Sequence, residues 1–239
     1  MTETLLQLRD VSVHYGGVKA LDGVTISLDE GEIVAILGQN GAGKSTVLKT
    51  IFGLAPLHSG KVLWHEREFE PIPYQVVQRG IAFVPQGRRV FSHLTIEENL
   101  EVGGFIVQDK QELKRRMEEV METFLVLRHK RKVKAGTLSS GQQQMLALAR
   151  GLMCSPIVLL LDEPTLGLSP KVSREVLAKI KEINEKHKTA IIIVEHNIRT
   201  LLAFVDRAYV LDKGKIVAEG KGKEVIESGI LEAVFMGRE

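Results

Sequence analysis

The residues with the clearest chemical potential are the nine from 38 to 46, Gly-Gln-Asn-Gly-Ala-Gly-Lys-Ser-Thr. They match Gly-x-x-x-x-Gly-Lys-Ser, a loop whose backbone N–H groups surround phosphate oxygens. Lys44 adds a positive charge toward the terminal phosphates, and the hydroxyl of Ser45 suits the Mg²⁺ that accompanies a nucleotide. A glycine-rich turn can match this pattern by chance, so the flanking sequence decides between the two interpretations.

The flanking segments place this phosphate loop between a strand and a helix. Residues 33–37, Ile-Val-Ala-Ile-Leu, form a continuous apolar run that is typical of a strand buried on both faces. Residues 47–52 continue at helical spacing until Gly53. Because strand, loop and helix follow in the order that this motif requires, we predict a site for a nucleoside triphosphate and Mg²⁺.

Polar residues follow three further apolar runs, each of which is typical of a buried strand. Gln86 comes after residues 81–84, Asp162 and Glu163 come after 158–161, and His196 comes after 190–194. Ligands of open α/β sheets bind at the carboxyl ends of the strands. We therefore expect these four side chains to lie beside the phosphate loop.

Three of these side chains suit separate tasks in phosphate hydrolysis. Asp162 can hold Mg²⁺ together with Ser45, and Glu163 can orient and deprotonate an attacking water. His196 can donate a hydrogen bond to charge that develops on the γ-phosphate. Without a phosphate loop, two such acids are more often a helix cap or a surface turn, and a lone histidine is more often structural.

The strand pattern stops between about residues 88 and 150, where the sequence is mainly helical. We therefore divide the chain into a core of residues 1–87 and 155–239 and a helical subdomain of residues 88–154. Within it, residues 137–142 open a helix that we predict from Gln143 to Met153, and the small polar residues at this opening, with Ser139 and Gly141, are suited to an anion. The basic run 128–134 is interpreted as a solvated helix end.

Composition excludes several classes of function. The net charge of +2, with three Tyr and one Trp in 239 residues, gives neither the field nor the stacking surface of a nucleic-acid-binding protein. The single Cys154 cannot form an internal disulfide. We expect no signal peptide and no membrane-spanning helix, because no apolar run is long enough. Contact with a membrane is therefore expected to come through a partner.

In chain order, the motifs resemble those of the ATP-binding-cassette (ABC) ATPases over essentially the whole chain. The segments that carry the resemblance are Tyr15, 38–46, Gln86, 138–142, 158–163, 166–170 and His196. The resemblance implies an α/β fold: a P-loop NTPase (RecA-like) core sheet with N-terminal antiparallel strands and an inserted, mainly helical subdomain. It also implies two cassettes packed head to tail, with ATP and Mg²⁺ between them.

The resemblance assigns roles that the residues alone do not, because Tyr15 by itself is more often a core residue at a strand end. Tyr15 would stack on the purine base of the nucleotide, and Gln86 would contact Mg²⁺. The phosphates would be held by Gly38, Gln39, Asn40, Gly41, Ala42, Gly43, Lys44, Ser45 and Thr46. The partner cassette would complete the site with Ser139, Ser140, Gly141 and Gln142.

Two positions depart from the usual family pattern. Ser140 stands where the family usually has the first glycine of Leu-Ser-Gly-Gly-Gln, and its β-carbon would crowd a backbone of positive φ. Because the second glycine, Gly141, remains, we expect function to survive. Ser169 stands where an aspartate is common, which weakens any role for residues 166–170 in contact between cassettes. Neither departure changes the roles predicted for Asp162 and Glu163.

Residues 84–91 and 94–100 further resemble the ATPase subunits of branched-chain amino acid importers, the LivF type in particular, although those subunits usually have Glu where Gln86 stands. This resemblance implies permease subunits, a second ATPase subunit that is identical or paralogous, and indirectly a substrate-binding protein. It implies a peripheral position on the cytoplasmic face of the cell membrane. Lipopolysaccharide-export ATPases and soluble ABC ATPases of cofactor assembly remain alternatives.

Overall fold

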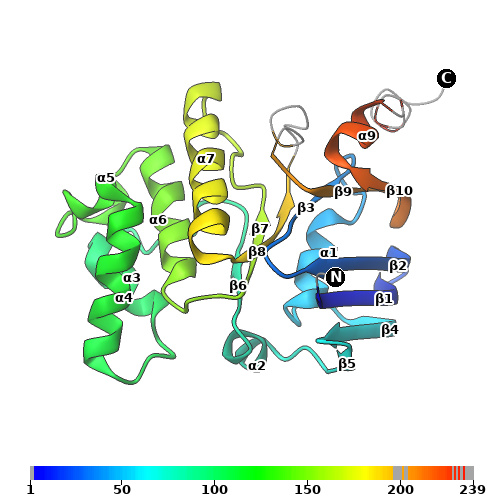
Figure 1. Ribbon diagram of the computed structural model, residues 1–239, viewed down its shortest axis with the longest axis horizontal. Helices are drawn as coiled ribbons and strands as arrows, with labels where there is room; N and C mark the ends of the chain where they lie inside the picture. The colour runs from blue at the N-terminus through cyan, green and yellow to red at the C-terminus, as the bar shows by residue number, and fades with distance from the viewer. Residues whose placement is uncertain are drawn as a thin grey trace.

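The computed structural model describes residues 3–195, 201, 204–227, 229, 231 and 234 of the chain (Figure 1). The predicted site residue His196 lies outside these described residues. In the described part, no helix is both long enough and apolar enough to cross a membrane.

The described strands form two sheets. The first is antiparallel, with strand order β2-β1-β4-β5. Its strands are β1 (Thr4–Tyr15), β2 (Val18–Asp29), β4 (Leu57–Trp64) and β5 (Arg67–Glu68). The second has the order β10-β9-β3-β8-β7-β6, and all its pairs are parallel except β9 with β10. Its strands are β3 (Ile33–Leu37), β6 (Ile81–Val84), β7 (Val158–Asp162), β8 (Ala190–Val194), β9 (Arg207–Asp212) and β10 (Lys215–Lys221).

The two faces of the parallel strands pack against different layers. In β3, Ile33, Ala35 and Leu37 belong to a core that includes the helices between β6 and β8. Val34 and Ile36 point the other way, into a core shared with helix α1 (Lys44–Ile51) and the antiparallel sheet. Figure 1 shows this order: α1 lies between the two sheets, and α6 and α7 lie on the opposite side of the parallel strands. Burial on both faces explains why β3, β7 and β8 are uninterrupted apolar runs.

Between β6 and β7 the described chain contains helices and no strand that belongs to either sheet. These are α3 (Ile96–Gly103), α4 (Lys110–Thr123), α5 (Leu125–Arg128), a short 3₁₀ turn (Ala135–Thr137) and α6 (Ser140–Leu152). Helix α4 has an apolar stripe at helical spacing, in which Met117, Val120 and Met121 are buried. Helix α6 begins three residues before the predicted start at Gln143, because Ser139 forms a capping box with Gln142.

Three further helices are described outside the segment between β6 and β7. Helix α2 (Pro73–Gln78) has proline at its first position, where the missing N–H costs no helical hydrogen bond. Helix α7 (Pro170–His187) is amphipathic and places Val176, Leu177 and Ile180 in the core. Helix α9 (Gly222–Glu227) follows β10.

Parallel pairing aligns the carboxyl ends of three strands. Strand β8 lies between β3 and β7, and Asp162 at the end of β7 pairs with Val194 at the end of β8. Strand β3 ends at Leu37, directly before the phosphate loop. The register of the sheet therefore brings the loop and the two carboxylates that follow β7 to one edge.

Candidate functional site

The phosphate loop can fold tightly because glycine occupies its most crowded positions. Gly43 has φ +106°, and a β-carbon there would lie 2.6 Å from the carbonyl oxygen of Ala20. At Gly38, with φ +154°, a β-carbon would lie 2.2 Å from the carbonyl oxygen of Leu211. No other residue fits either position, so the glycines of the motif are required by the fold around them.

Lys44 curls back onto the loop that precedes it. Its Nζ donates hydrogen bonds to the carbonyl oxygens of Gly38 and Gln39, each at 2.9 Å, and the residue is 5% exposed. Burial lowers the pKa of the Lys44 ammonium, while the charges of Glu163 and Asp162 act in the opposite direction. A single buried ammonium is thus held in the middle of the loop, where an anion would be most strongly attracted.

Ser45 and Asp162 connect the phosphate loop to the end of β7. The hydroxyl of Ser45 donates a hydrogen bond of 2.8 Å to Oδ1 of Asp162. Burial is the largest cause that raises the pKa of Asp162, and the neighbouring charge of Glu163 raises it as well. A hydroxyl beside a buried carboxylate is an all-oxygen donor set, which fits Mg²⁺ better than a softer metal.

Glu163 is held in an unusual backbone conformation. Its φ is +48°, and its backbone N–H donates to the carbonyl oxygen of Val194 at 2.9 Å. The side chain is 8% exposed, and Nε2 of Gln86 donates to its Oε2 at 2.6 Å. The structure therefore brings together Gln86 and Glu163, which the sequence predicted only as neighbours at one sheet edge.

A pocket of about 180 Å³ opens on this edge. Its lining residues are Ala20, Asn40, Gly41, Gly43, Lys44, Ser45, Thr46 and Glu163. Tyr15 does not line it; this residue ends β1 and is 43% exposed. The pocket therefore brings most of the predicted phosphate-binding residues together with Glu163, the predicted general base. Tyr15, the residue predicted to stack on the nucleotide base, is not among the residues that line it.

The sequence interpretation gave no role to Glu195, which follows β8. It is 2% exposed, and its Oε1 accepts a hydrogen bond of 2.6 Å from the backbone N–H of Thr165. This contact fixes the chain two residues after Glu163. An acid directly after an apolar run is the signal that identified Asp162, and the same signal points to Glu195.

The segment 138–142 does not contribute to the pocket of its own chain. Ser139 caps α6, and Ser139 and Ser140 are both exposed. Gly141 is buried, and a β-carbon there would lie 2.4 Å from Cγ1 of Val172 on α7. The start of α6, which the sequence predicts to hold an anion, is therefore not part of the pocket of the same chain.

The expectation that Ser140 crowds a backbone of positive φ is wrong. Ser140 is the first residue of α6 and is not among the residues with positive φ. A helical residue accommodates a β-carbon without strain. Ser169, the other departure, caps α7 by accepting a hydrogen bond from the N–H of Val172 at 3.5 Å.

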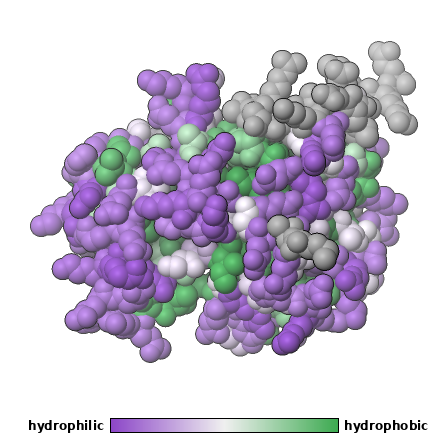
Figure 2. Space-filling view, viewed as in Figure 1, coloured by the Kyte–Doolittle hydropathy of each residue, from purple (hydrophilic) through white to green (hydrophobic). Residues whose placement is uncertain are grey.

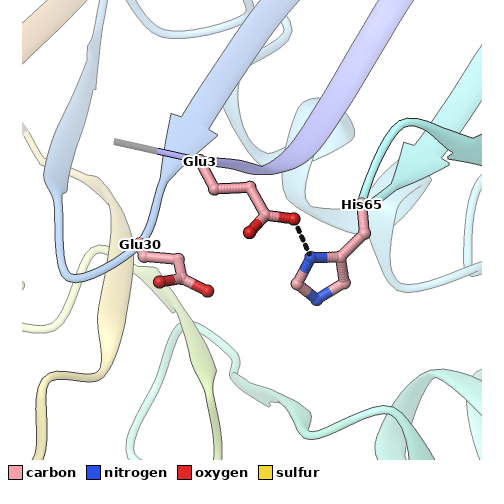
Figure 3. Close-up of side chains that lie close together, drawn as sticks. All are labelled: Glu3, Glu30 and His65. Carbon is pink, nitrogen blue, oxygen red and sulfur yellow. Dashed lines mark hydrogen bonds and ion pairs between the residues drawn. The ribbon is translucent and has the colours of Figure 1, made fainter. Parts of the chain in front are cut away.

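A second group of titratable side chains shares no residue with the pocket. Glu3, Glu30 and His65 lie together at the ends of three strands of the antiparallel sheet (Figure 3). Nδ1 of His65 lies 3.2 Å from Oε1 of Glu3. Glu3 and Glu30 are exposed, the backbone N–H of Glu30 donates to the carbonyl oxygen of Glu3 at 3.2 Å, and the contact between His65 and Glu3 is a surface hydrogen bond.

Comparison with known proteins decides the family. A profile described as ABC transporter matches residues 21–166, which is more than half of the chain. This protein belongs to the ABC transporter family. The resemblance inferred from its motifs is therefore confirmed.

Two relatives in the ABC transporter family match over nearly the full chain. The branched-chain amino acid transport ATP-binding protein BraG of Pseudomonas aeruginosa is 41% identical, covering 98% of this chain and 100% of the relative. The probable branched-chain amino acid transport protein LivF of Archaeoglobus fulgidus is 39% identical, with 98% and 99% covered.

Solved structures of ABC cassettes confirm the predicted fold class. The ADP conformation of an ATP-binding cassette of an ABC transporter is similar with a TM-score of 0.89 and 28% identity, covering 99% of this chain and 100% of that one. A dimeric cassette in a post-hydrolysis state bound to ADP and phosphate has a TM-score of 0.79 and 28% identity, covering 91% and 98%. This chain is thus an ABC cassette with the ATPase fold.

Proposed function

We propose that this ABC cassette is the ATP-hydrolysing subunit of an importer of branched-chain amino acids. The observation that carries the proposal is the hydrogen bond from Ser45 to Asp162, which connects the phosphate loop to the strand end that bears the two acids. The substrate class is supported by the names of BraG and LivF, which are transport proteins for these amino acids.

The pocket supplies separate groups for the phosphates and for the metal. Residues 38–46 would surround the phosphates of ATP, and the ammonium of Lys44 would leave the carbonyl oxygens of Gly38 and Gln39 for them. Ser45, Asp162 and Gln86 would hold Mg²⁺. When bound, Mg²⁺ neutralises charge on the phosphate oxygens.

Glu163 is our candidate for the general base. In the structure its Oε2 accepts the hydrogen bond from Gln86, which orients the carboxylate and leaves lone pairs for a further donor. The carboxylate would orient and deprotonate an attacking water. His196 stays a prediction, because it lies outside the described residues.

Two cassettes would complete each ATP site. The exposed Ser139 and Ser140 at the start of α6 do not line the pocket of their own chain, so a second cassette would bring such a helix start to the phosphates. Gly141 and Gln142 belong to the same helix start, and Tyr15 would stack on the base. The dimeric cassette bound to ADP and phosphate supports this arrangement.

We assign contact with the permease to the helical subdomain, residues 88–154, and the adjoining edge strand β6. A groove of about 260 Å³ lies there, and we call it the β6–α6 groove. Its lining includes Phe83, Phe91, Phe105, Arg89 and Arg150. Phe105 is 68% exposed and Phe91 is 47% exposed, which is unusual for large apolar side chains unless a partner covers them.

Surface hydropathy is consistent with a partner at this side of the molecule. Figure 2 shows hydrophobic residues reaching the surface between the helical part and the sheets, within a mainly hydrophilic face. A cassette bound there to permease subunits would lie peripherally on the cytoplasmic face of the membrane. A substrate-binding protein would then act on it only through the permease. The relatives give no support to lipopolysaccharide export or cofactor assembly.

Uptake by cells tests the proposed function. Cells that lack this gene should lose uptake of labelled leucine, isoleucine and valine at low concentration, and the wild-type gene should restore it. The purified chain should also bring permease subunits with it from gently solubilised membranes. Unchanged uptake together with purely soluble partners would contradict the proposal.

A further inference from the structure

Glu195 is a buried acid to which the proposed mechanism gives no role. It directly follows β8 and is less exposed than either Asp162 or Glu163. Burying a carboxylate is unfavourable unless hydrogen bonds stabilise it, and the five residues of β8 before it are all apolar. An acid at this position therefore requires an explanation beyond the filling of space.

The end of β8 holds the chain around Glu163 at two points. The carbonyl oxygen of Val194 accepts a hydrogen bond from the backbone N–H of Glu163 at 2.9 Å. Oε1 of Glu195 accepts one from the backbone N–H of Thr165 at 2.6 Å, and Thr165 is itself buried. The first of these contacts is made by backbone alone, so only the second depends on which side chain follows β8.

The backbone of Glu163 needs such support. Its φ of +48° lies in the left-handed region, which a residue other than glycine keeps only where its surroundings hold it there. The turn that follows is joined by backbone hydrogen bonds from Leu166 to the carbonyl oxygen of Glu163 at 3.2 Å and from Leu168 to that of Thr165 at 3.1 Å. Because these bonds tie Glu163 and Thr165 into one turn, an anchor on Thr165 also fixes the direction of the Glu163 side chain.

We propose that Glu195 is a positioning residue for ATP hydrolysis: by accepting the N–H of Thr165, it holds Glu163 in the orientation in which Glu163 takes a proton from water. Glu195 is not among the residues that line the pocket, so it acts through Glu163 and not on the reacting atoms. A charged acceptor binds a backbone N–H more strongly than a neutral one does, which explains an acid at this position. This inference rests on the proposed function, because it requires Glu163 to be the base.

Two substitutions of similar length separate the hydrogen bond from the bulk of the side chain. In single-turnover hydrolysis by the complex with its permease, Glu195→Met, which has no oxygen, should lower the rate at saturating ATP by about tenfold or more. The ATP concentration that gives half of this rate should change by less than about twofold, because the phosphate loop is untouched. Glu195→Gln keeps an amide oxygen and should hydrolyse ATP within about threefold of the wild-type rate. Equal losses in the two variants would overturn the proposal.

Asp206 provides a control for a general loss of stability. Its Oδ2 accepts a hydrogen bond of 2.8 Å from the backbone N–H of Ile33, at the end of β3 that lies opposite the phosphate loop. Asp206→Ala also removes a carboxylate that holds a backbone N–H, so it should lower the melting temperature. Its single-turnover rate should stay within about twofold of wild type, because the contact is remote from Glu163. A loss of rate as large as that of Glu195→Met would overturn the proposal.

A double variant decides whether Glu195 acts through the base. Once Glu163→Gln has replaced the base by an amide, its orientation no longer affects proton transfer, so adding Glu195→Met should slow hydrolysis by less than about twofold. Losses that multiply would show that Glu195 acts independently of Glu163 and would overturn the proposal, as would a wild-type rate in Glu195→Met. The proposed function would survive both results, since it fails only if the wild-type cassette brings no permease with it or the complex does not hydrolyse ATP.

Discussion

At the scale of single residues, the site combines strained or buried groups that stability alone does not favour. Glu163 has a positive φ, and Lys44 and Asp162 are charged residues with little exposure. Each of these features lowers the free energy of unfolding of a protein without a ligand. Their convergence at one sheet edge is explained if phosphates and a cation complete the set.

Asp162 should show a trade between stability and activity. Burial raises its pKa above the ordinary value of 3.8. An acid whose pKa is raised on folding binds its proton more tightly in the folded state, so its contribution to stability falls as pH rises from 3.8 through the raised pKa. At pH 7 the ionised carboxylate is therefore unfavourable for folding.

Asp162→Asn should remove that cost and keep an acceptor for the hydroxyl of Ser45. We expect the melting temperature at pH 7 to rise by about 2–4 °C for each ~1 kcal/mol recovered. Mg²⁺-dependent hydrolysis of ATP should fall by about a hundredfold or more. Calorimetry at pH 7 and a phosphate-release assay would measure both effects. A lower melting temperature would contradict the assigned cause of the pKa shift.

Lys44 should be required for nucleotide binding itself. Lys44→Ala removes the buried ammonium at the centre of the phosphate loop, and we expect affinity for ATP to fall by at least about tenfold. Lys61→Ala is the control, because Lys61 forms an exposed ion pair with Glu68 and is remote from the pocket lining. Titration with a fluorescent ATP analogue would measure binding. Equal affinity in both variants would contradict the phosphate-loop assignment.

At the scale of elements, the sequence predicted most of the fold that positions the site. The strands at 81–84 and 190–194 appear with the predicted bounds, and the sequence signals of a helix start lie at the observed start of the helix Pro170–His187. Their apolar periodicity is strong, and Pro170 and the polar residues around it mark the helix start. The contact of Gln86 with Glu163 was not predictable, because it depends on side-chain conformations across the sheet edge.

The start of α6 shows the limit of motif comparison. The family pattern suggested strain at Ser140, but the backbone there is helical and the glycine that matters for packing is Gly141. Which of two adjacent residues faces α7 depends on where the helix begins. That start was placed three residues late, since the capping box of Ser139 and Gln142 was not recognised.

Gly141→Ala should therefore disturb the packing of α6 on α7. Its β-carbon would lie 2.4 Å from Cγ1 of Val172, and such overpacking costs about 1–3 kcal/mol. The midpoint of urea unfolding should fall accordingly. Val172→Ala in the same chain removes the clashing methyl groups and should recover part of the loss. A double variant no more stable than Gly141→Ala alone would contradict this packing.

At the scale of the whole molecule, the pocket and the β6–α6 groove are connected through one short segment, residues 85–91. This segment supplies Gln86, which contacts the pocket residue Glu163, and it supplies Arg89 and Phe91 to the groove. Movement of this segment on docking would reach Gln86 and hence Glu163. The subunits that would bind the groove cannot be predicted from this sequence, because the partner's contacts are made by its own residues.

Single-turnover hydrolysis by the complex with its permease tests the central claim most directly. With the wild-type cassette, bound ATP should be converted to ADP. With Glu163→Gln it should remain ATP, because the amide cannot accept the proton of water, and hydrolysis should slow by about 10²–10⁴-fold. Glu175→Gln, at an exposed position on α7, should behave as wild type. Hydrolysis by Glu163→Gln at the wild-type rate would show that Glu163 is not the base and would contradict the account.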